Sequence, residues 1–225
     1  MNNKEIYELF DKIGCLTFTT VSDGIPHSRI AHFNGFDENG FYFRTMVVKP
    51  FYRHLVNKPV ISICGLYPDS KIDLDPETGL PYFKPGYFIR LIGEVRPVPA
   101  DEIREKAETN LHLKSAAHDL EAYPAMSNFC LYRGRGEVFD YDFEMEHRDH
   151  KLLRTRFSFG GGSSSIAGCR ITDKCISCGQ CIEECTFKAI KEASGKYEII
   201  PERCDACGSC SVVCPADAIE AAEDL

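Results

Sequence analysis

The sequence predicts an α+β protein in two parts: a larger, mainly antiparallel β domain followed by a small cysteine-rich domain. Two observations lead to this fold class. In the first two thirds of the chain, runs of β-branched and aromatic residues are separated by short turn signals such as Asp23-Gly24. In the last quarter, from Cys169 onward, lie nine of the twelve cysteines of the 225-residue chain.

Each expected element of the β domain follows from local patterning. Apolar residues at helical spacing predict a helix over 2–13, and strands follow over 16–21 and 25–36 on either side of the first turn. A second turn at Glu38-Asn39-Gly40 leads into a strand over 41–46, and two hairpins in succession imply an antiparallel meander. The remaining expected elements are a short helix over 49–57, strands over 60–67 and 87–98, a helix over 99–117 and a strand over 128–141. Gly134 and Gly136 in the last strand indicate a bulge or a close backbone approach.

Composition and charge exclude several classes of function. Apolar residues make up 44% of the chain and charged residues 27%, which is ordinary for a globular protein. No apolar run approaches the roughly 18 residues of a membrane span. The formal charge of −8 gives no electrostatic support for binding nucleic acid. The first ten residues show no signal-peptide pattern. We therefore expect a cytoplasmic protein, in whose reducing compartment clustered cysteines more often bind metal than form disulfides.

The domain boundary is expected in a Gly/Ser-rich run. The stretch FSFGGGSSS, residues 157–165, has the composition of a flexible tether. We expect a β domain over 1–161, a linker over 162–168 and a cysteine-rich domain over 169–225. The segment 68–86 is rich in Pro, Asp and Gly and longer than an ordinary hairpin connection, so it is interpreted either as a functional loop, such as a substrate lid, or as a plain surface loop.

The cysteine-rich part contains an internal repeat with an offset of 29 residues. CISCGQCIEECTFKAI, 175–190, aligns with CDACGSCSVVCPADAI, 204–219, and all four cysteines coincide. Each copy reads C-x2-C-x2-C-x3-C, the spacing of bacterial two-cluster ferredoxins, in which the fourth cysteine of each copy binds the other cluster. The sequence therefore predicts two [4Fe–4S] clusters, the first on Cys175, Cys178, Cys181 and Cys214 and the second on Cys204, Cys207, Cys210 and Cys185.

Zinc is the main alternative to iron–sulfur clusters. Zinc sites usually pair two-cysteine knuckles, and three cysteines in each loop fit that pattern poorly. Thr186 stands where the second copy has Pro215, a difference that changes helix entry rather than ligation. Cys169 has no ligand role in this scheme and is interpreted as a plain thiol. The other three cysteines lie in strand-like apolar contexts and are expected in the core: Cys15, Cys64 and Cys130.

The first part of the chain carries an ordered series of residues rather than one specific motif. A strand bearing Arg29 is followed by a hairpin, by Phe43-Arg44-Thr45, by Lys49 opening a short helix, and by Asn57-Lys58-Pro59. In this order and spacing, the region of about 5–161 resembles the pyridoxamine-5′-phosphate-oxidase-like family of FMN-binding split barrels. The resemblance implies an antiparallel split β-barrel and a homodimer with FMN in the groove between subunits. Other branches of that superfamily bind haem or the deazaflavin F420, which remain alternatives.

A flavin phosphate is a dianion, which favours cations and N–H donors around it. The resemblance and the basic residues together give six candidate cofactor contacts: Arg29, Arg44, Thr45, Lys49, Tyr52 and Arg53. Arg44 and Arg53 also fit ordinary surface charges, and Phe51 is a further candidate to cover the flavin ring. His147 and His150 are interpreted as part of a charged surface segment rather than a ligand pair.

No catalytic acid or base is assigned. Strand alternation places His27 and Arg29 on one face and His32 on the other, and a core or surface role is expected for both histidines. The substrate-side basic residues of the vitamin-B6 enzyme have no convincing counterparts, so oxidation of pyridoxamine phosphate does not follow.

The combination of cofactors predicts an iron–sulfur flavoprotein oxidoreductase, in the form of an FMN-dependent reductase. We expect low-potential electrons from a ferredoxin or similar donor to pass through the two clusters to FMN and on to a small-molecule acceptor. The alternative is an electron carrier or redox-responsive protein without a small-molecule substrate. Its acidic tail, with 6 Lys+Arg against 11 Asp+Glu from residue 169 onward, would then be a docking surface.

Overall fold

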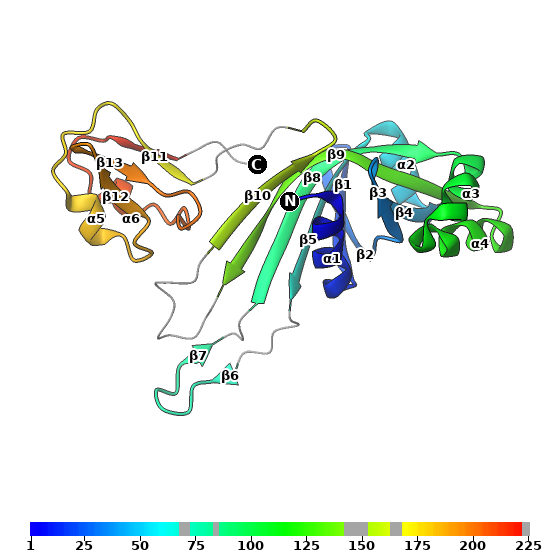
Figure 1. Cartoon of the computed structure of the whole chain (residues 1–225), viewed down its shortest axis with the longest axis horizontal. Helices are drawn as coiled ribbons and strands as arrows, with labels where there is room; N and C mark the ends of the chain where they lie inside the picture. Colours follow the sequence, from blue (N-terminus) through cyan, green and yellow to red (C-terminus); the bar gives the residue numbers. More distant parts are fainter. Residues whose placement is uncertain (68–72, 83–85, 142–152, 163–167, 222–225) are drawn as a thin grey trace. The chain divides into compact units, whose positions relative to one another are not determined.

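The computed structural model describes residues 1–67, 73–82, 86–141, 153–162 and 168–221 (Figure 1). The chain forms two compact units. The first comprises Met1–Tyr67, Ile89–Glu137 and Phe157–Ser163, and the second Pro68–Phe88, Val138–Arg156 and Ser164–Leu225. Most of the expected linker, 163–167, lies outside the described residues. His147 and His150 also lie outside the described residues. The proposed boundary therefore stays a prediction.

An eight-stranded sheet dominates the β-rich part of the chain. Its path runs β2–β1–β5–β8–β9–β4–β3, and β10 pairs with β9. The strands are β1 (Leu16–Ser22), β2 (Ile25–Ala31), β3 (Gly35–Asp37), β4 (Gly40–Met46), β5 (Val60–Tyr67), β8 (Gly86–Val98), β9 (Met126–Tyr141) and β10 (Leu153–Phe159). The two predicted hairpins are present as β1–β2 and β3–β4, both antiparallel. They lie at opposite ends of the path because β5, β8 and β9 pair between them, so the predicted meander is wrong.

Two predicted helices are confirmed and a third is divided. Helix α1 (Asn3–Ile13) begins with a capping box, in which the side chains of Asn2 and Glu5 each accept the other's backbone N–H. Helix α2 is Pro50–Asn57. The expected helix over 99–117 is instead α3 (Ala100–Thr109), a 3₁₀ turn (Leu111–Leu113) and α4 (Lys114–Ala122). Asn110 causes the break, because its side chain accepts the His112 N–H and donates to the Phe36 carbonyl.

Phenylalanine rings fill the core of the first unit. Phe18 on β1 lies 5.2 Å from Phe43 on β4, and Phe43 lies 5.8 Å from Phe129 on β9, measured between ring centroids. Alternation along β5 buries Ile61 and Ile63 and turns Cys64 outward. Cys130 is buried as predicted, but Cys64 and Cys15 are exposed. The prediction of core positions for these two cysteines was wrong, because local apolarity does not say which face of a strand is covered.

Gly136 marks a close backbone approach, as the sequence suggested. A Cβ at this position of β9 would lie 2.4 Å from the carbonyl oxygen of Arg90 on β8 and 2.6 Å from the ring of Phe157 on β10. At Gly134 the corresponding distance to the ring of Phe159 is 2.8 Å. The two glycines therefore let β8, β9 and β10 pack without side chains between them.

The repeat in the sequence is also a repeat in the backbone of the second unit. Strand β11 (Cys169–Ile171) pairs with β14 (Ile219–Ala221), and β12 (Ile190–Ala193) pairs with β13 (Lys196–Ile199). Helices α5 (Gln180–Glu184) and α6 (Ser209–Val212) occupy equivalent places in the two copies. Left-handed φ angles recur at the same offset of 29 residues in three pairs of positions: Ser177 and Ala206, Gly179 and Gly208, and Lys188 and Asp217.

The long predicted segment 68–86 contains a small hairpin. Strands β6 (Asp73–Leu74) and β7 (Pro81–Tyr82) pair across a turn, in which the Asp75 carboxylate accepts the backbone N–H groups of Glu77 and Thr78. The other residues of the segment lie outside the described part, so a lid role stays a prediction. Among the residues that the structure describes, no helix is long and apolar enough to cross a membrane.

Candidate functional site

Two cavities of the second unit are each lined by four of the predicted ligand cysteines. The first cavity is lined by Cys175, Cys178, Cys181 and Cys214. The second is lined by Cys185, Cys204, Cys207 and Cys210. In each cavity, three cysteines come from one copy of the repeat and the fourth from the other copy. The structure therefore brings together the two crossed sets that the spacing predicted.

Backbone N–H groups donate to cysteine sulfurs in the same way in both copies. Each donor lies two or four residues after the sulfur it contacts, and the four N···S distances are 3.3–3.4 Å. The pairs are Ser177 with Cys175, Ala206 with Cys204, Ala189 with Cys185, and Ala218 with Cys214. Such bonds stabilise negative charge on a ligating thiolate and tune the potential of a cluster.

The residues that line the two cavities fit a cubane cluster. Apolar residues of the two short sheets, including Ile190 and Ile219, pack around the cysteines. Within the described ranges, no three His, Cys, Asp or Glu side chains converge where a single metal ion could bind. A cubane is larger than one ion, and its ligand sulfurs surround it from several sides. The arrangement therefore fits [4Fe–4S] clusters better than mononuclear zinc.

Arg29 is held in place on the inward face of β2. Its guanidinium donates to the Thr20 hydroxyl at 2.9 Å and to the His27 carbonyl at 2.8 Å, and it lies 4.1 Å from the ring centroid of Phe51. Thr20 is 2% exposed, and its hydroxyl is also 3.0 Å from Nδ1 of His54. Phe51 is buried beneath the guanidinium and is thus a core residue rather than a cover for a flavin ring.

Two further candidate cations, Lys49 and Arg53, lie at the N-terminal end of α2. Lys49 is the exposed N-cap residue of α2 and offers no side-chain acceptor to the helix N–H groups, and the first turn holds no acidic residue. The Arg53 guanidinium donates to the Val48 carbonyl at 3.2 Å. This helix N-terminus therefore carries uncompensated positive potential, which is suited to an anion.

The other three candidate contacts divide between two faces of β4. Thr45 is buried on the same face as Phe43, and Tyr52 on α2 contacts the ring of Phe129. Arg44 lies on the opposite face, where its guanidinium pairs with the Asp119 carboxylate of α4 at 2.5 Å. The structure does not bring Arg44 together with the other cations, because neighbouring side chains of a strand alternate in direction.

Thr20 and His54 were missed from the sequence. Thr20 follows the buried Leu16 and Phe18 at the next inward position of β1, and a polar residue there requires a partner. Desolvation, together with the positive charges of His27, Arg29 and Arg53, lowers the pKa of His54. The ring is therefore neutral near pH 7, and its Nδ1 can exchange a hydrogen bond with the Thr20 hydroxyl.

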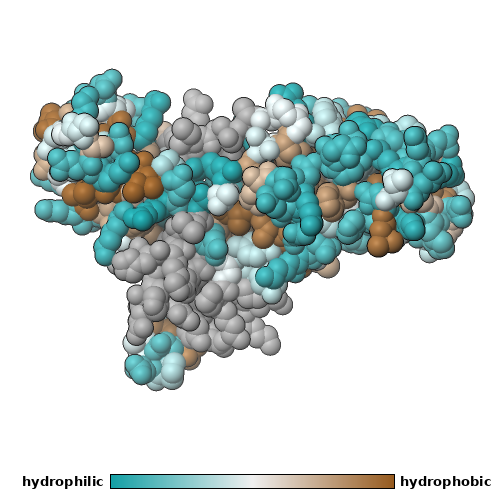
Figure 2. All heavy atoms as spheres, in the orientation of Figure 1, coloured by the Kyte–Doolittle hydropathy of each residue, from teal (hydrophilic) through white to brown (hydrophobic). Residues whose placement is uncertain are grey.

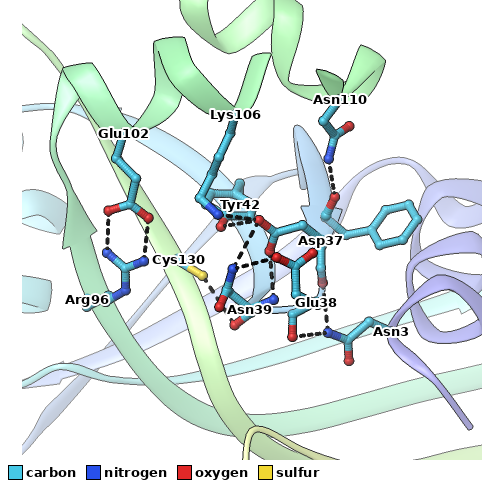
Figure 3. A network of polar contacts seen from close by, with 11 residues as sticks. Asn3, Asp37, Glu38, Asn39, Tyr42, Arg96, Glu102, Lys106, Asn110 and Cys130 are labelled. Carbon is cyan, nitrogen blue, oxygen red and sulfur yellow. Dashed lines mark hydrogen bonds and ion pairs between the residues drawn. The ribbon is translucent and has the colours of Figure 1, made fainter. Parts of the chain in front are cut away.

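A separate polar network fastens α3 to the β3–β4 hairpin (Figure 3). The Asp37 carboxylate accepts hydrogen bonds from Lys106 at 2.6 Å, Tyr42 at 2.9 Å and the Asn39 N–H at 2.8 Å. Burial opposes the ionisation of Asp37, but these donors outweigh it and lower the pKa of the carboxyl. Burial also raises the pKa of Cys130 to about 12, so this thiol is protonated and structural.

Comparison with known families decides what the first part of the chain is. A family model described as pyridoxamine 5′-phosphate oxidase matches residues 3–140, which is more than half of the chain. The chain belongs to this family. A model of a 4Fe-4S dicluster domain matches residues 174–219. The protein thus joins a split-barrel domain of the oxidase family to a ferredoxin domain, as the sequence predicted.

Individual proteins are similar to one or the other part of this chain. A ferredoxin from Thermoanaerobacterium thermosaccharolyticum is 62% identical over 29 residues, 13% of this chain and 53% of the ferredoxin, so the chain spans about half the length of that relative. Among solved structures, a NimC/NimA family protein from Clostridium acetobutylicum has a TM-score of 0.48 and 18% identity, covering 70% of this chain and 92% of its own. A pyridoxamine 5′-phosphate oxidase-related, FMN-binding protein from Nostoc punctiforme has a TM-score of 0.44 and 14% identity, covering 69% and 93%.

Proposed function

We propose that this chain is an iron–sulfur flavoprotein oxidoreductase that passes low-potential electrons through two [4Fe–4S] clusters to FMN and on to a small-molecule acceptor. The observation that carries the proposal is that the eight predicted ligand cysteines line two cavities, four in each, in one chain with a domain of the oxidase family. The cysteines hold the clusters and the split barrel holds the flavin. In this proposal, 162–168 links a barrel over 1–161 to a ferredoxin domain over 169–225.

The cations around α2 support binding of a phosphate dianion. Arg29 is oriented before any ligand arrives, because Thr20 and His27 fix its guanidinium over a core ring. Lys49 and Arg53 lie at the N-terminal end of α2, where cations and free backbone N–H groups suit an anion. Thr45 and Tyr52 are the other two residues proposed to contact the flavin here. When bound, the flavin supplies the exchange of one or two electrons.

A homodimer would complete the flavin site. Three cavities of the first unit, around Asp37, Glu94 and Cys15, contain none of the six candidate contacts. The outward face of β1, β2 and β5 exposes apolar side chains, with Ile30 67% exposed and Val60 46% exposed. Covering such a face is favourable, and a second copy would provide the other wall of a groove.

We further propose a reducing, cytoplasmic setting, in which cysteines stay available as cluster ligands, with delivery of electrons by a ferredoxin or a similar low-potential donor.

Cofactor analysis of the anaerobically purified protein tests the proposal. We expect about eight iron and eight sulfide per chain, together with FMN. Reduction by a low-potential donor should bleach the flavin, and the double variant Cys178→Ser/Cys207→Ser should slow this reduction by at least tenfold. Cys15→Ser, which changes an exposed cysteine outside both cavities, is the matched control. Unchanged flavin reduction in the double variant, or zinc in place of iron, would overturn the proposal.

One observation favours a second function, that of an electron carrier. Apolar side chains reach the surface of the part that carries α5 and α6 (Figure 2), with Val212 88%, Ile176 65% and Ile182 37% exposed. Exposed apolar side chains on a domain with an excess of acidic residues suit brief docking of a redox partner. Substrate-dependent reoxidation of the reduced flavin separates the two functions, because a carrier would pass electrons only to a protein. The absorbance of the extracted cofactor separates FMN from haem and F420.

A further inference from the structure

The second cluster cavity contains a fifth cysteine. Cys169 lines this cavity together with the four predicted ligands, and it packs against the buried cluster that contains Cys210. The residue before Cys169 also lies close to Cys204, since a Cβ added at Gly168 would lie 3.4 Å from the Cys204 sulfur. Pairing of Cys169 with Ala221 in the β11–β14 sheet fixes this position.

The first cavity has no counterpart to Cys169. Strands β11 and β13 each precede the first cysteine of a copy, and each contributes one residue to either cavity: Ile171 and Tyr197 line the first, and Cys169 and Ile199 line the second. Strand β13 contributes Tyr197 to the first cavity, whose ring lies against Gly179 of the cysteine loop. Cys169 of β11 takes the corresponding place in the second. The two sites therefore differ in their supply of thiols, with four around the first and five around the second.

We propose that Cys169 is a reserve ligand of the second cluster, able to bind the iron that loses Cys204 or Cys210. This inference rests on the proposed function, which places a [4Fe–4S] cluster in the cavity. The exchange is a simple substitution: the bond between iron and the departing Cys204 or Cys210 sulfur breaks and that thiolate takes up a proton, while the Cys169 thiol releases its proton and its thiolate forms the new iron–sulfur bond. No electron is transferred, and the charge of the ligand set is kept.

The consequence is unequal tolerance of damage at the two sites. Loss of a ligand thiolate at the first cavity leaves an iron without its fourth protein ligand. The same loss at Cys204 or Cys210 leaves the Cys169 thiol in the same cavity. In the undamaged protein Cys169 is not a ligand, so its removal alone changes nothing in the iron content.

Iron and sulfide analysis of full-length, anaerobically purified variants tests the inference, with electron paramagnetic resonance of the reduced clusters as the second readout. Cys204→Ser and Cys210→Ser should each keep about eight iron per chain, with an altered spectrum for one cluster. Adding Cys169→Ser to either should lower the iron content to about four. Cys175→Ser, the equivalent of Cys204→Ser in the first copy, is the matched control and should lose iron although Cys169 is present. Cys169→Ser alone should match the wild type.

Two results would overturn the inference alone: equal iron loss in Cys204→Ser, Cys210→Ser and Cys175→Ser, or no further loss on adding Cys169→Ser. A wild type with far fewer than eight iron per chain would overturn the proposed function as well, which separates the two failures. Two different ligand variants are used so that misfolding of one does not decide the result.

Discussion

Replacement of Asp37 by asparagine should loosen the attachment of α3 to the β3–β4 hairpin. The substitution keeps the shape of the side chain but removes a charge that is only 10% exposed and lies 2.6 Å from the Lys106 ammonium. Hydrogen bonds to charged groups contribute about 1.5–3 kcal/mol each. Lys106 is 20% exposed, so its ammonium regains some hydration in the variant. We therefore expect the local stability to fall by about 2 kcal/mol, near the lower end of that range.

Amide hydrogen exchange of the full-length protein measures this loss locally. A change of about 2 kcal/mol corresponds to roughly thirtyfold faster exchange in α3 and β4. Asp101→Asn is the matched control, because Asp101 forms a 2.7 Å ion pair with Arg104 but is 96% exposed. Exposed pairs contribute about 0–1 kcal/mol, so exchange should change less than about fivefold. Equal effects of the two substitutions would refute the assignment of a stabilising role to the buried contacts.

The effect should also depend on pH in a defined direction. The pKa of Asp37 is lowered in the folded protein, so its contribution is fully present above the unfolded pKa of about 4 and is lost as the pH falls through the lower folded value. The difference in exchange between wild type and Asp37→Asn should therefore be constant from about pH 5 to 8 and shrink below about pH 4. A difference that grows on acidification would contradict this reasoning.

Two further substitutions test the candidate flavin-binding residues around Arg29 and the packing of β8, β9 and β10. Thr20→Val removes the hydroxyl that holds Arg29, and we expect about five- to tenfold weaker FMN binding by equilibrium dialysis, whereas Thr109→Val, at an exposed position at the end of α3, should leave the affinity unchanged. Gly136→Ala places a Cβ 2.4 Å from a carbonyl of β8 and should destabilise the fold by about 3 kcal/mol, more than the roughly 1 kcal/mol expected for Gly24→Ala in an open turn at φ +77°. The midpoints of thermal unfolding give the order of the two glycine variants, and the reverse order would contradict the close approach.

Local features of the fold were predictable from the sequence, whereas non-local pairing was not. The strand over 60–67 is found as predicted, because β-branched residues and bounding turns act within a few positions. The position of β5 between β1 and β8 depends on contacts across the whole domain, which no short pattern contains. For the same reason the exposure of Cys64 was predicted wrongly.

The candidate sites divide in the same manner. The crossed sets of cysteines followed from spacing alone, because the loop geometry is set within each copy of the repeat. Strand alternation is enough to predict that Arg44 and Thr45 lie on opposite faces of β4. The ion pair of Arg44 with Asp119 could not be predicted, because it depends on where α4 packs. Thr20 shows that a polar residue at an inward strand position is a usable signal for a positioning role.

The left-handed backbone of the cysteine loops ties cluster assembly to folding. Four residues with side chains adopt this conformation there, with φ angles of 57°, 59°, 47° and 48° at Ser177, Ala206, Lys188 and Asp217. Each of these left-handed residues destabilises the folded state by about 1–2 kcal/mol. The small core of the ferredoxin domain offsets little of this energy. Bonds to iron would supply that energy. Removal of iron by a chelator should therefore unfold the ferredoxin domain, while the barrel with its phenylalanine core stays folded. Loss of iron would thus make the tail vulnerable to proteases and leave behind a flavin domain that no longer receives electrons.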